Sequence, residues 1–237
     1  MKSFKKLSIL LALCMACIFV FAACGPKGGG KQEDPTEAQT EAQTEEATTE
    51  EATTKEATPA GKTSLKGSVS GTTYTNTYLN LKFNATDDWV FYTDAELAAE
   101  NNVSESEFVN NFDSLVEDDQ IYDLYAIRSD RTNINMIIAS AEGLDIARVR
   151  KYVEELGPSM EESLAEQGLT DISWKMSDTS LPLKDYAVFE ISSNYDGVAI
   201  YQKQAYALVD GYSFIITITC VGTDECDEIF GYFTKIK

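Results

Sequence analysis

The sequence of 237 residues contains no histidine. This absence removes the commonest general base and metal ligand, and with it every Ser-His or Cys-His nucleophile arrangement. Basic residues are also scarce, because 19 Lys and Arg stand against 39 Asp and Glu, for a formal net charge of −20. So acidic a chain repels phosphate groups, and we expect no nucleic-acid partner. We expect no enzyme activity, no catalytic or metal-binding residue and no cofactor.

Residues 1–23 have the parts of an export leader. A basic start precedes an apolar run from Leu7 to Phe21, which is too short for a permanent membrane helix of roughly 20 apolar residues. The small residues that follow, directly before Cys24, resemble the lipobox of bacterial lipoproteins, although Phe21 stands where an aliphatic residue is usual. The resemblance implies cleavage after Ala23 and a lipid on the Cys24 thiol. The protein would then be extracytoplasmic and anchored to the bacterial cell membrane, with plain secretion and an uncleaved anchor as the alternatives.

Residues 24–65 form a second region of different composition. Between Cys24 and Leu65 there is no aromatic or branched aliphatic residue, and nine acidic residues outnumber four lysines. Such a segment cannot bury enough apolar surface to offset its ordering entropy. We expect a disordered, extended Thr/Glu/Ala-rich tether, with a charged helix as the alternative, that holds a domain away from the lipid surface.

Residues 66–237 are long enough for a single domain with a proper core. Alternating apolar residues predict a strand from Thr77 to Phe83, and later runs predict further strands. Capping boxes, Thr93 with Glu96 and Ser104 with Glu107, predict helix starts near Asp94 and Glu105. The further strands are expected at 121–127, 134–139, 172–176, 186–191, 198–209 and 212–220. Consecutive strands of this kind favour an α+β fold, with an antiparallel sheet of about six strands covered by helices.

The strongest periodic signal is a central helix. Its apolar residues recur at steps of three and four, and they are Ile146, Val149, Val153, Leu156, Met160 and Leu164. Gly168 stands where a left-handed C-terminal cap belongs. Pro158 predicts that the helix is kinked or split in two.

The opening of this region resembles PsbP-like domains and the small lipoproteins that share their fold. The segment from Tyr74 to Phe83, a turn and then Trp89 is similar to the first motif of that family, and the closing residues 233–236 are similar to its last. The turn at 84–88 departs from the family because it lacks a proline. The resemblance implies a PsbP-like αβα sandwich, and an accessory or surface-binding role rather than catalysis.

Acidic clusters are the remaining candidates for chemistry, either as acid/base pairs or as ligands of a hard cation such as Ca²⁺. They are Asp87 and Asp88; Glu117, Asp118 and Asp119; and Asp224, Glu225, Asp227 and Glu228. The first two clusters read as solvated turns, and the third complements a helix dipole. No stretch has the alternating ligand spacing of a calcium loop.

Two cysteines of the domain are expected to approach each other. Cys220 lies on the apolar face of the last long strand, and Cys226 shares a helical stripe with Ile229, Phe230 and Phe233. Both sulfurs should therefore point into the same core, and an exported domain permits a disulfide. A Cys220–Cys226 bridge and two small buried hydrophobic side chains are the two interpretations.

Several aromatic residues could pack in the core or line a ligand pocket, and packing is the commoner fate. They are Trp89, Trp174, Tyr186, Phe189, Tyr201, Tyr206, Tyr212 and Phe214. The sequence thus predicts a surface-tethered, non-catalytic binding or accessory module of an envelope complex, whose ligand is an unknown protein or small molecule. The alternative is an extracellular hydrolase that acts on glycans with carboxylates alone, which needs two carboxylates facing each other across a cleft.

Overall fold

The computed structural model describes residues 63–236, apart from the side chain of Leu156. The predicted leader, the cleavage site after Ala23, the lipidated Cys24 and the tether up to residue 62 lie outside the described residues. Leu65, the last residue assigned to the tether, is buried in the core of the domain.

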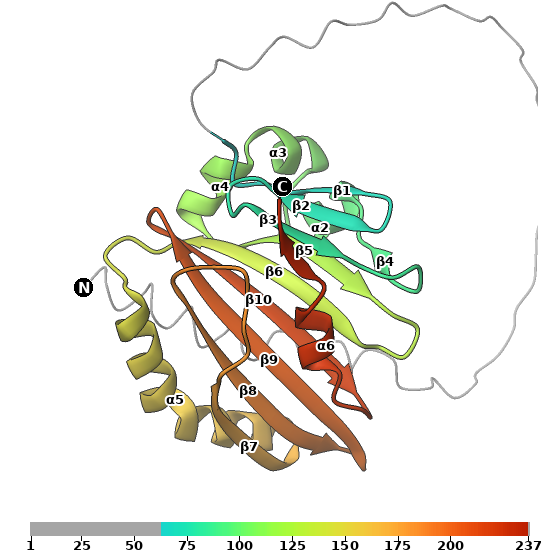
Figure 1. Cartoon of the computed structure of the whole chain (residues 1–237), viewed down its shortest axis with the longest axis vertical. Coiled ribbons are helices and arrows are strands. Elements are labelled where there is room, and N and C mark those ends of the chain that lie inside the picture. The colour runs from blue at the N-terminus through green and yellow to red at the C-terminus, as the bar shows by residue number, and fades with distance from the viewer. Residues whose placement is uncertain (1–62, 237) are drawn as a thin grey trace, which may run out of the picture.

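The central feature is an antiparallel sheet of seven strands, which crosses the molecule in Figure 1. Its strands, in spatial order, are β4 (Val90–Phe91), β5 (Ile121–Ile127), β6 (Asn133–Ser140), β10 (Tyr212–Val221), β9 (Val198–Val209), β8 (Tyr186–Tyr195) and β7 (Thr170–Ser177). The α+β class with an antiparallel sheet is confirmed, and the sheet has one strand more than the six expected.

Tight turns set the register of the three longest strands. Asp196 and Gly197 join β8 to β9, and Asp210 and Gly211 join β9 to β10, all four with positive φ. Two consecutive residues of positive φ form the type I′ turn, whose twist matches that of the paired strands. The Asp-Gly pairs therefore specify which residues face each other across β8, β9 and β10.

A second sheet, which the sequence did not predict, covers one face of the first. Its four strands, in spatial order, are β1 (Ser68–Ser70), β2 (Thr73–Asn76), β3 (Leu81–Asn84) and β11 (Phe233–Lys235). The predicted strand from Thr77 to Phe83 is wrong in its first half, because residues 77–80 form a turn in which Asn80 has a φ of 54°. Apolar and polar residues alternate within this turn as they would in a strand, which explains the wrong prediction.

Short helices complete the same layer, and they share one core with both sheets. They are α2 (Asp94–Glu100), α3 (Glu105–Asn110), α4 (Phe112–Asp118) and α6 (Cys226–Phe230). The predicted starts at Asp94 and Glu105 are confirmed, and the capping box of Thr93 and Glu96 is complete. At Ser104 the side chain caps the helix by accepting from the Glu107 amide.

The opposite face of the main sheet is covered by the long helix α5 (Ile146–Glu166), as Figure 1 shows. Val149, Val153, Met160 and Leu164 of the predicted stripe are buried against the sheet. Gly168 has a φ of 88° and donates to the Ala165 carbonyl, while Leu169 donates to the Leu164 carbonyl. These bonds form a Schellman motif and confirm the predicted cap.

The helix α5 continues through Pro158, so the expected split is wrong. Gly157 precedes the proline and has no Cβ to clash with the pyrrolidine ring, which relaxes the usual restriction on a residue before proline. Among residues 63–236, none of the helices combines the length and apolar character that spanning a bilayer requires.

Candidate functional site

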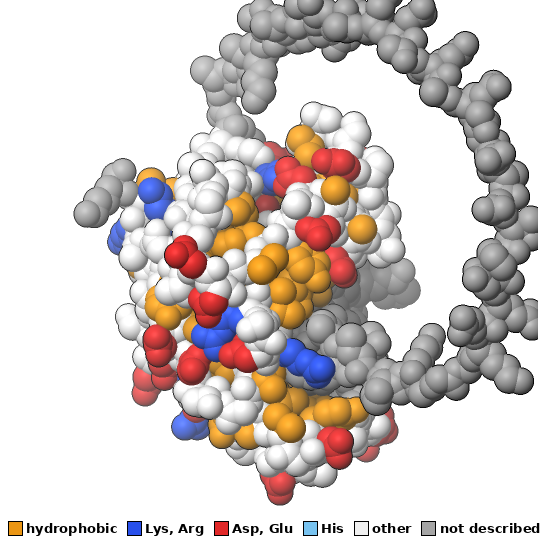
Figure 2. All heavy atoms as spheres, turned by 90° about the vertical axis from the view of Figure 1, so that its right-hand side faces the viewer, with side chains coloured by type: hydrophobic (Ala, Val, Ile, Leu, Met, Phe, Trp, Pro, Cys, Tyr) orange, Lys and Arg blue, Asp and Glu red, His pale blue; other side chains and the backbone are white. Residues whose placement is uncertain are grey.

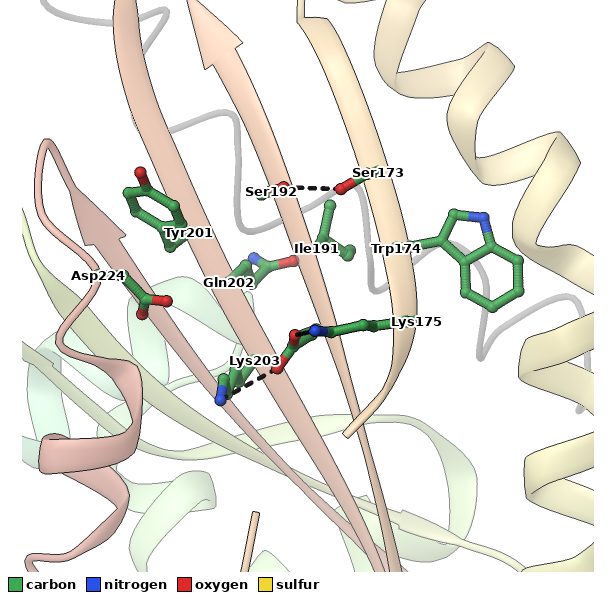
Figure 3. A pocket seen from close by; sticks show the side chains of 10 residues that line it. Ser173, Trp174, Lys175, Ile191, Ser192, Tyr201, Gln202, Lys203 and Asp224 are labelled. Atoms are coloured by element: carbon green, nitrogen blue, oxygen red, sulfur yellow. Dashed lines mark hydrogen bonds and ion pairs between the residues drawn. The ribbon is translucent and has the colours of Figure 1, made fainter. Parts of the chain in front are cut away.

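A hollow of about 290 Å³ lies on the main sheet over β7, β8 and β9. Two rows of side chains cross its floor, because the strand register aligns them. Ser173, Ser192 and Tyr201 form one row, and Lys175, Glu190 and Lys203 form the other. These side chains share the sheet face opposite α5, whereas Trp174 points from β7 toward α5 (Figure 3).

The charged row is a chain of ion pairs. The Glu190 carboxylate accepts from Lys175 at 2.7 Å and from Lys203 at 3.1 Å, and Lys203 also donates to Asp227 of α6 at 2.7 Å. Partial burial opposes ionisation of Glu190, but hydrogen bonds from the two lysines outweigh it and lower the pKa of the carboxyl. For Lys203, the bonds to Asp227 and Glu190 likewise outweigh burial and raise the pKa. Glu190 and Lys203 are therefore held in their charged forms.

The second row presents hydroxyl groups. The Ser173 and Ser192 side chains are hydrogen-bonded at 2.8 Å, and Tyr201 continues the row on β9. Asp224, from the loop between β10 and α6, forms a wall of the hollow beside Tyr201 (Figure 3). The floor thus combines hydroxyls, one aromatic ring and fixed charges of both signs, which suits a polar ligand.

A second hollow, of about 320 Å³, lies at the start of α5. Three aspartates line it, namely Asp145, Asp185 and Asp210. Asp145 is the N-cap of α5, and its side chain accepts from the Arg148 amide at 2.8 Å. This aspartate therefore has a structural role that accounts for its position.

The predicted pair Cys220 and Cys226 is brought together. The two sulfur atoms lie 3.2 Å apart inside the core, and both thiols are free in the structure. The bridge between them stays a prediction. The other predicted site residues, Ala23 and Cys24, lie outside the described residues.

The first and third acidic clusters meet at Arg128, which pairs with both Asp88 and Glu225. Asp88 lies in a turn and pairs with Arg128, Glu117 accepts from the Tyr212 hydroxyl, and Asp227 pairs with Lys203. Among the described residues, no group of three or more acidic or thiol side chains is placed to hold a metal ion. Figure 2 likewise shows acidic side chains scattered over one face of the domain.

The aromatic residues are divided between core and surface. Trp89, Phe189, Tyr206 and Phe214 are buried, as packing predicts. The remaining four, Trp174, Tyr186, Tyr201 and Tyr212, are only partly buried and pack against the edges of the two cores. Of the eight, Tyr201 and Trp174 belong to the strands that line the hollow over β7–β9, and the Trp174 ring points away from its floor toward α5.

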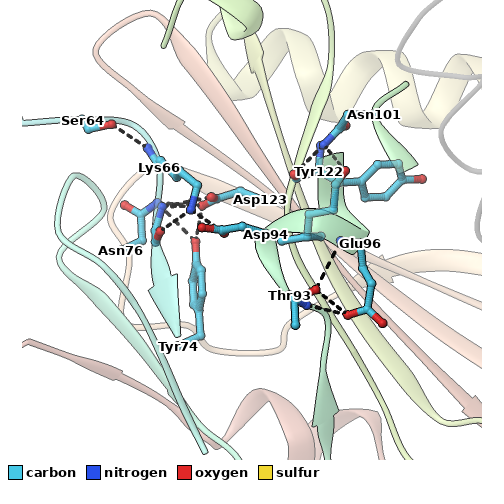
Figure 4. A network of polar contacts seen from close by, with 12 residues as sticks. Ser64, Lys66, Tyr74, Asn76, Thr93, Asp94, Glu96, Asn101, Tyr122 and Asp123 are labelled. Atoms are coloured by element: carbon cyan, nitrogen blue, oxygen red, sulfur yellow. Dashed lines mark hydrogen bonds and ion pairs between the residues drawn. The ribbon is translucent and has the colours of Figure 1, made fainter. Parts of the chain in front are cut away.

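A buried polar network around Asp123 was missed by the sequence reasoning. The Asp123 carboxylate accepts from the Gly67 amide at 2.9 Å, from the Tyr74 hydroxyl at 2.5 Å and from Asn76 at 3.3 Å (Figure 4). Burial raises the pKa of the Asp123 carboxyl to about 6, although these hydrogen bonds act to lower it. In the sequence, the one sign of this network was a single carboxylate within the otherwise apolar run 121–127.

No protein-family profile and no curated protein match the sequence. Among solved structures, the chain is similar to the solution structure of cyanobacterial PsbP (CyanoP) from Synechocystis sp. PCC 6803, with 13% identity, a TM-score of 0.37, and coverage of 76% of this chain and 97% of that one.

It is also similar to LpqN, involved in cell envelope biogenesis of Mycobacterium tuberculosis, with 14% identity and a TM-score of 0.34, over 64% of this chain and 76% of that one. A PsbP structure is thus among the neighbours. Similarity at this level carries no argument about function.

Proposed function

We propose that this chain is a bacterial lipoprotein whose domain is a non-catalytic binding or accessory module at the outer side of the cell membrane. The leader, Cys24 and the acidic segment that follows support the anchor and the location. The polar hollow over β7–β9 supports the binding role. Its ligand is a protein partner or a small polar molecule.

The observation that supports a non-catalytic role is that the Glu190 carboxylate is held between Lys175 and Lys203. A general acid needs a raised pKa, and the ion pairs lower the pKa of Glu190. Among residues 63–236, the carboxyl group whose pKa is raised is that of Asp123, which is 3% exposed and lies outside the hollow. The site therefore offers fixed hydrogen-bonding groups rather than an acid/base pair, which argues against the glycan hydrolase.

The test is site-specific photo-cross-linking on intact cells. A benzophenone amino acid replaces Ser173, which is exposed and lines the hollow, or Glu161, which is exposed on α5 at the opposite face. We expect one defined adduct from position 173 that position 161 does not give. The same adducts from both positions would contradict a dedicated site.

Two matched charge-reversal variants test whether the captured partner contacts the hollow. Lys175 and Lys151 are equally exposed, at 74% and 73%, and each pairs with one glutamate. Lys175→Glu places a negative charge beside Glu190 in the hollow, so we expect it to remove most of the adduct from position 173. Lys151→Glu makes the same change in net charge on α5 and should leave the adduct intact. Equal losses in the two variants would show that net charge, not the hollow, controls capture.

A further inference from the structure

The free thiols of Cys220 and Cys226 have the placement of a disulfide pair. Cys220 is near the end of β10, Cys226 is the first residue of α6, and both side chains are fully buried. Their sulfur atoms, 3.2 Å apart, need to approach by about 1 Å to reach the disulfide bond length of about 2.0 Å. A movement of this size requires side-chain rotation rather than a rearrangement of β10 or α6.

A hydrogen bond joins the two thiols in the folded domain. The Cys226 thiol donates to the Cys220 sulfur, and this hydrogen bond lowers the pKa of Cys220. The same bond, together with burial, raises the pKa of Cys226. The thiolate is the nucleophile in disulfide exchange, and because this hydrogen bond forms only when α6 is packed, it does not decide which thiolate attacks first.

The segment between the two cysteines, residues 221–225, contributes Asp224 to the wall of the polar hollow. Asp224 lines the hollow, and Glu225 pairs with Arg128 at 2.7 Å. On the far side of Cys226, Asp227 pairs with Lys203 on the floor. A covalent link between the two cysteines would therefore hold the wall and the floor of the hollow in fixed relation.

We propose that Cys220 and Cys226 form an intrachain disulfide in the exported protein, and that this bond fixes the 221–225 segment beside the polar hollow. The oxidant is a disulfide R–S–S–R of an extracytoplasmic redox buffer. One of the two thiolates attacks one of its sulfurs and releases R–S⁻, and the other thiolate then attacks the sulfur of the first cysteine and releases the second R–S⁻. The two cysteines lose two protons and two electrons, and the oxidant leaves as two molecules of R–SH. Exchange takes place before α6 packs, because both sulfurs are inaccessible in the folded domain.

Thiol labelling of the exported full-length chain tests the bond. Cells are quenched in acid, the protein is denatured and alkylated with or without prior reduction, and peptide mapping locates the label. We expect Cys220 and Cys226 to be labelled only after reduction, and the unreduced peptide to be lighter by the mass of two hydrogen atoms. Labelling of both residues without reductant would overturn the proposal. Mapping reports Cys24 separately, so a failure of lipidation is not confused with a failure of the bond.

Hydrogen exchange of the wild-type protein tests the effect on the hollow and needs no variant that might misfold. Amides of residues 221–225 should exchange roughly tenfold or more faster after reduction, because a short closed loop is released. Amides of α5, which packs on the other face, serve as the internal control and should be unchanged. Equal exchange of residues 221–225 in the oxidised and reduced protein would show that the bond does not fix the loop.

Discussion

The buried position of the Asp123 side chain depends on a local irregularity in the main sheet. The pairing of β5 with β6 shifts between Tyr122 and Leu124, so Asp123 is the extra residue of a β-bulge. A bulge re-aims the side chains around it, and here the carboxylate enters the core, where Gly67, Tyr74 and Asn76 donate to it. The network ties the first residues of the domain to the main sheet.

We predict that Asp123 makes stability depend on pH between about pH 4 and about pH 7. Its pKa is raised from 3.8 to about 6 in the folded protein, so the folded state binds the proton more tightly than the unfolded state. The resulting stabilisation is fully present below 3.8 and is lost as the pH rises through about 6. Its upper size is about 3 kcal/mol, at about 1.4 kcal/mol per pKa unit.

Urea unfolding at a series of pH values measures the effect. Asp123→Asn does not titrate, so the wild type should gain stability over this variant as the pH falls. Asp178→Asn, at an exposed position, is the control and should follow the wild-type profile. Parallel profiles for the wild type and Asp123→Asn would rule out Asp123 as the source.

The two cysteines and Asp123 differ in how far the sequence could predict them. Strand and helix periodicity each placed one sulfur toward the core, and the structure puts the two sulfurs in contact. The same periodicity could not reveal the bulge at Asp123, because a bulge interrupts the alternation on which the reasoning depends. Nor could it align Lys175, Glu190 and Lys203, which belong to three strands and meet only through their register.

At the scale of elements, the contact between α5 and β7 depends on a glycine. Gly157 is buried, and a Cβ at this position would overlap the indole ring of Trp174. The glycine therefore has two roles: it leaves room for the Trp174 ring, and it relieves the clash with the ring of Pro158.

We predict that Gly157→Ala destabilises the domain, although alanine favours helices over glycine by about 1 kcal/mol. Overpacking of a core typically costs about 1–3 kcal/mol, and the restriction before Pro158 adds to it. Thermal or urea unfolding gives the change in the free energy of unfolding. Trp174→Leu in the same chain makes room for the methyl group, so the double variant should lose less than the sum of the two single variants. Strict additivity would contradict the proposed overlap.

At the scale of the whole molecule, the chain combines regions of opposite character. Residues 25–64 carry charge without aromatic or branched aliphatic side chains, whereas Leu65 and the residues after it build two cores on either side of one sheet. The composition of the first region predicts a tether, and that of the second predicts a packed domain. We infer that the link between them separates the domain from the lipid surface.

We predict that lipid attachment depends on Cys24 alone. The thiol is the acceptor of the diacylglycerol in the proposed anchor, so Cys24→Ala should abolish incorporation of an alkyne-labelled fatty acid into the protein. Cys17→Ala changes the other cysteine that follows a small residue in the leader and should leave incorporation unchanged. Labelling that persists in Cys24→Ala, or disappears in Cys17→Ala, would place the lipid elsewhere.

The sequence by itself determined the class of the fold, the long strands, and the apolar stripe and C-terminal cap of α5, because periodicity, caps and Asp-Gly turns act between residues close in the chain. The tertiary structure decided the second sheet, the bulge that buries Asp123 and the polar hollow over β7–β9. Each of these depends on the register between distant strands, which no local pattern encodes. Lys175, Glu190 and Lys203 are ordinary charged residues in the sequence, and only the alignment of β7, β8 and β9 turns them into a row of ion pairs.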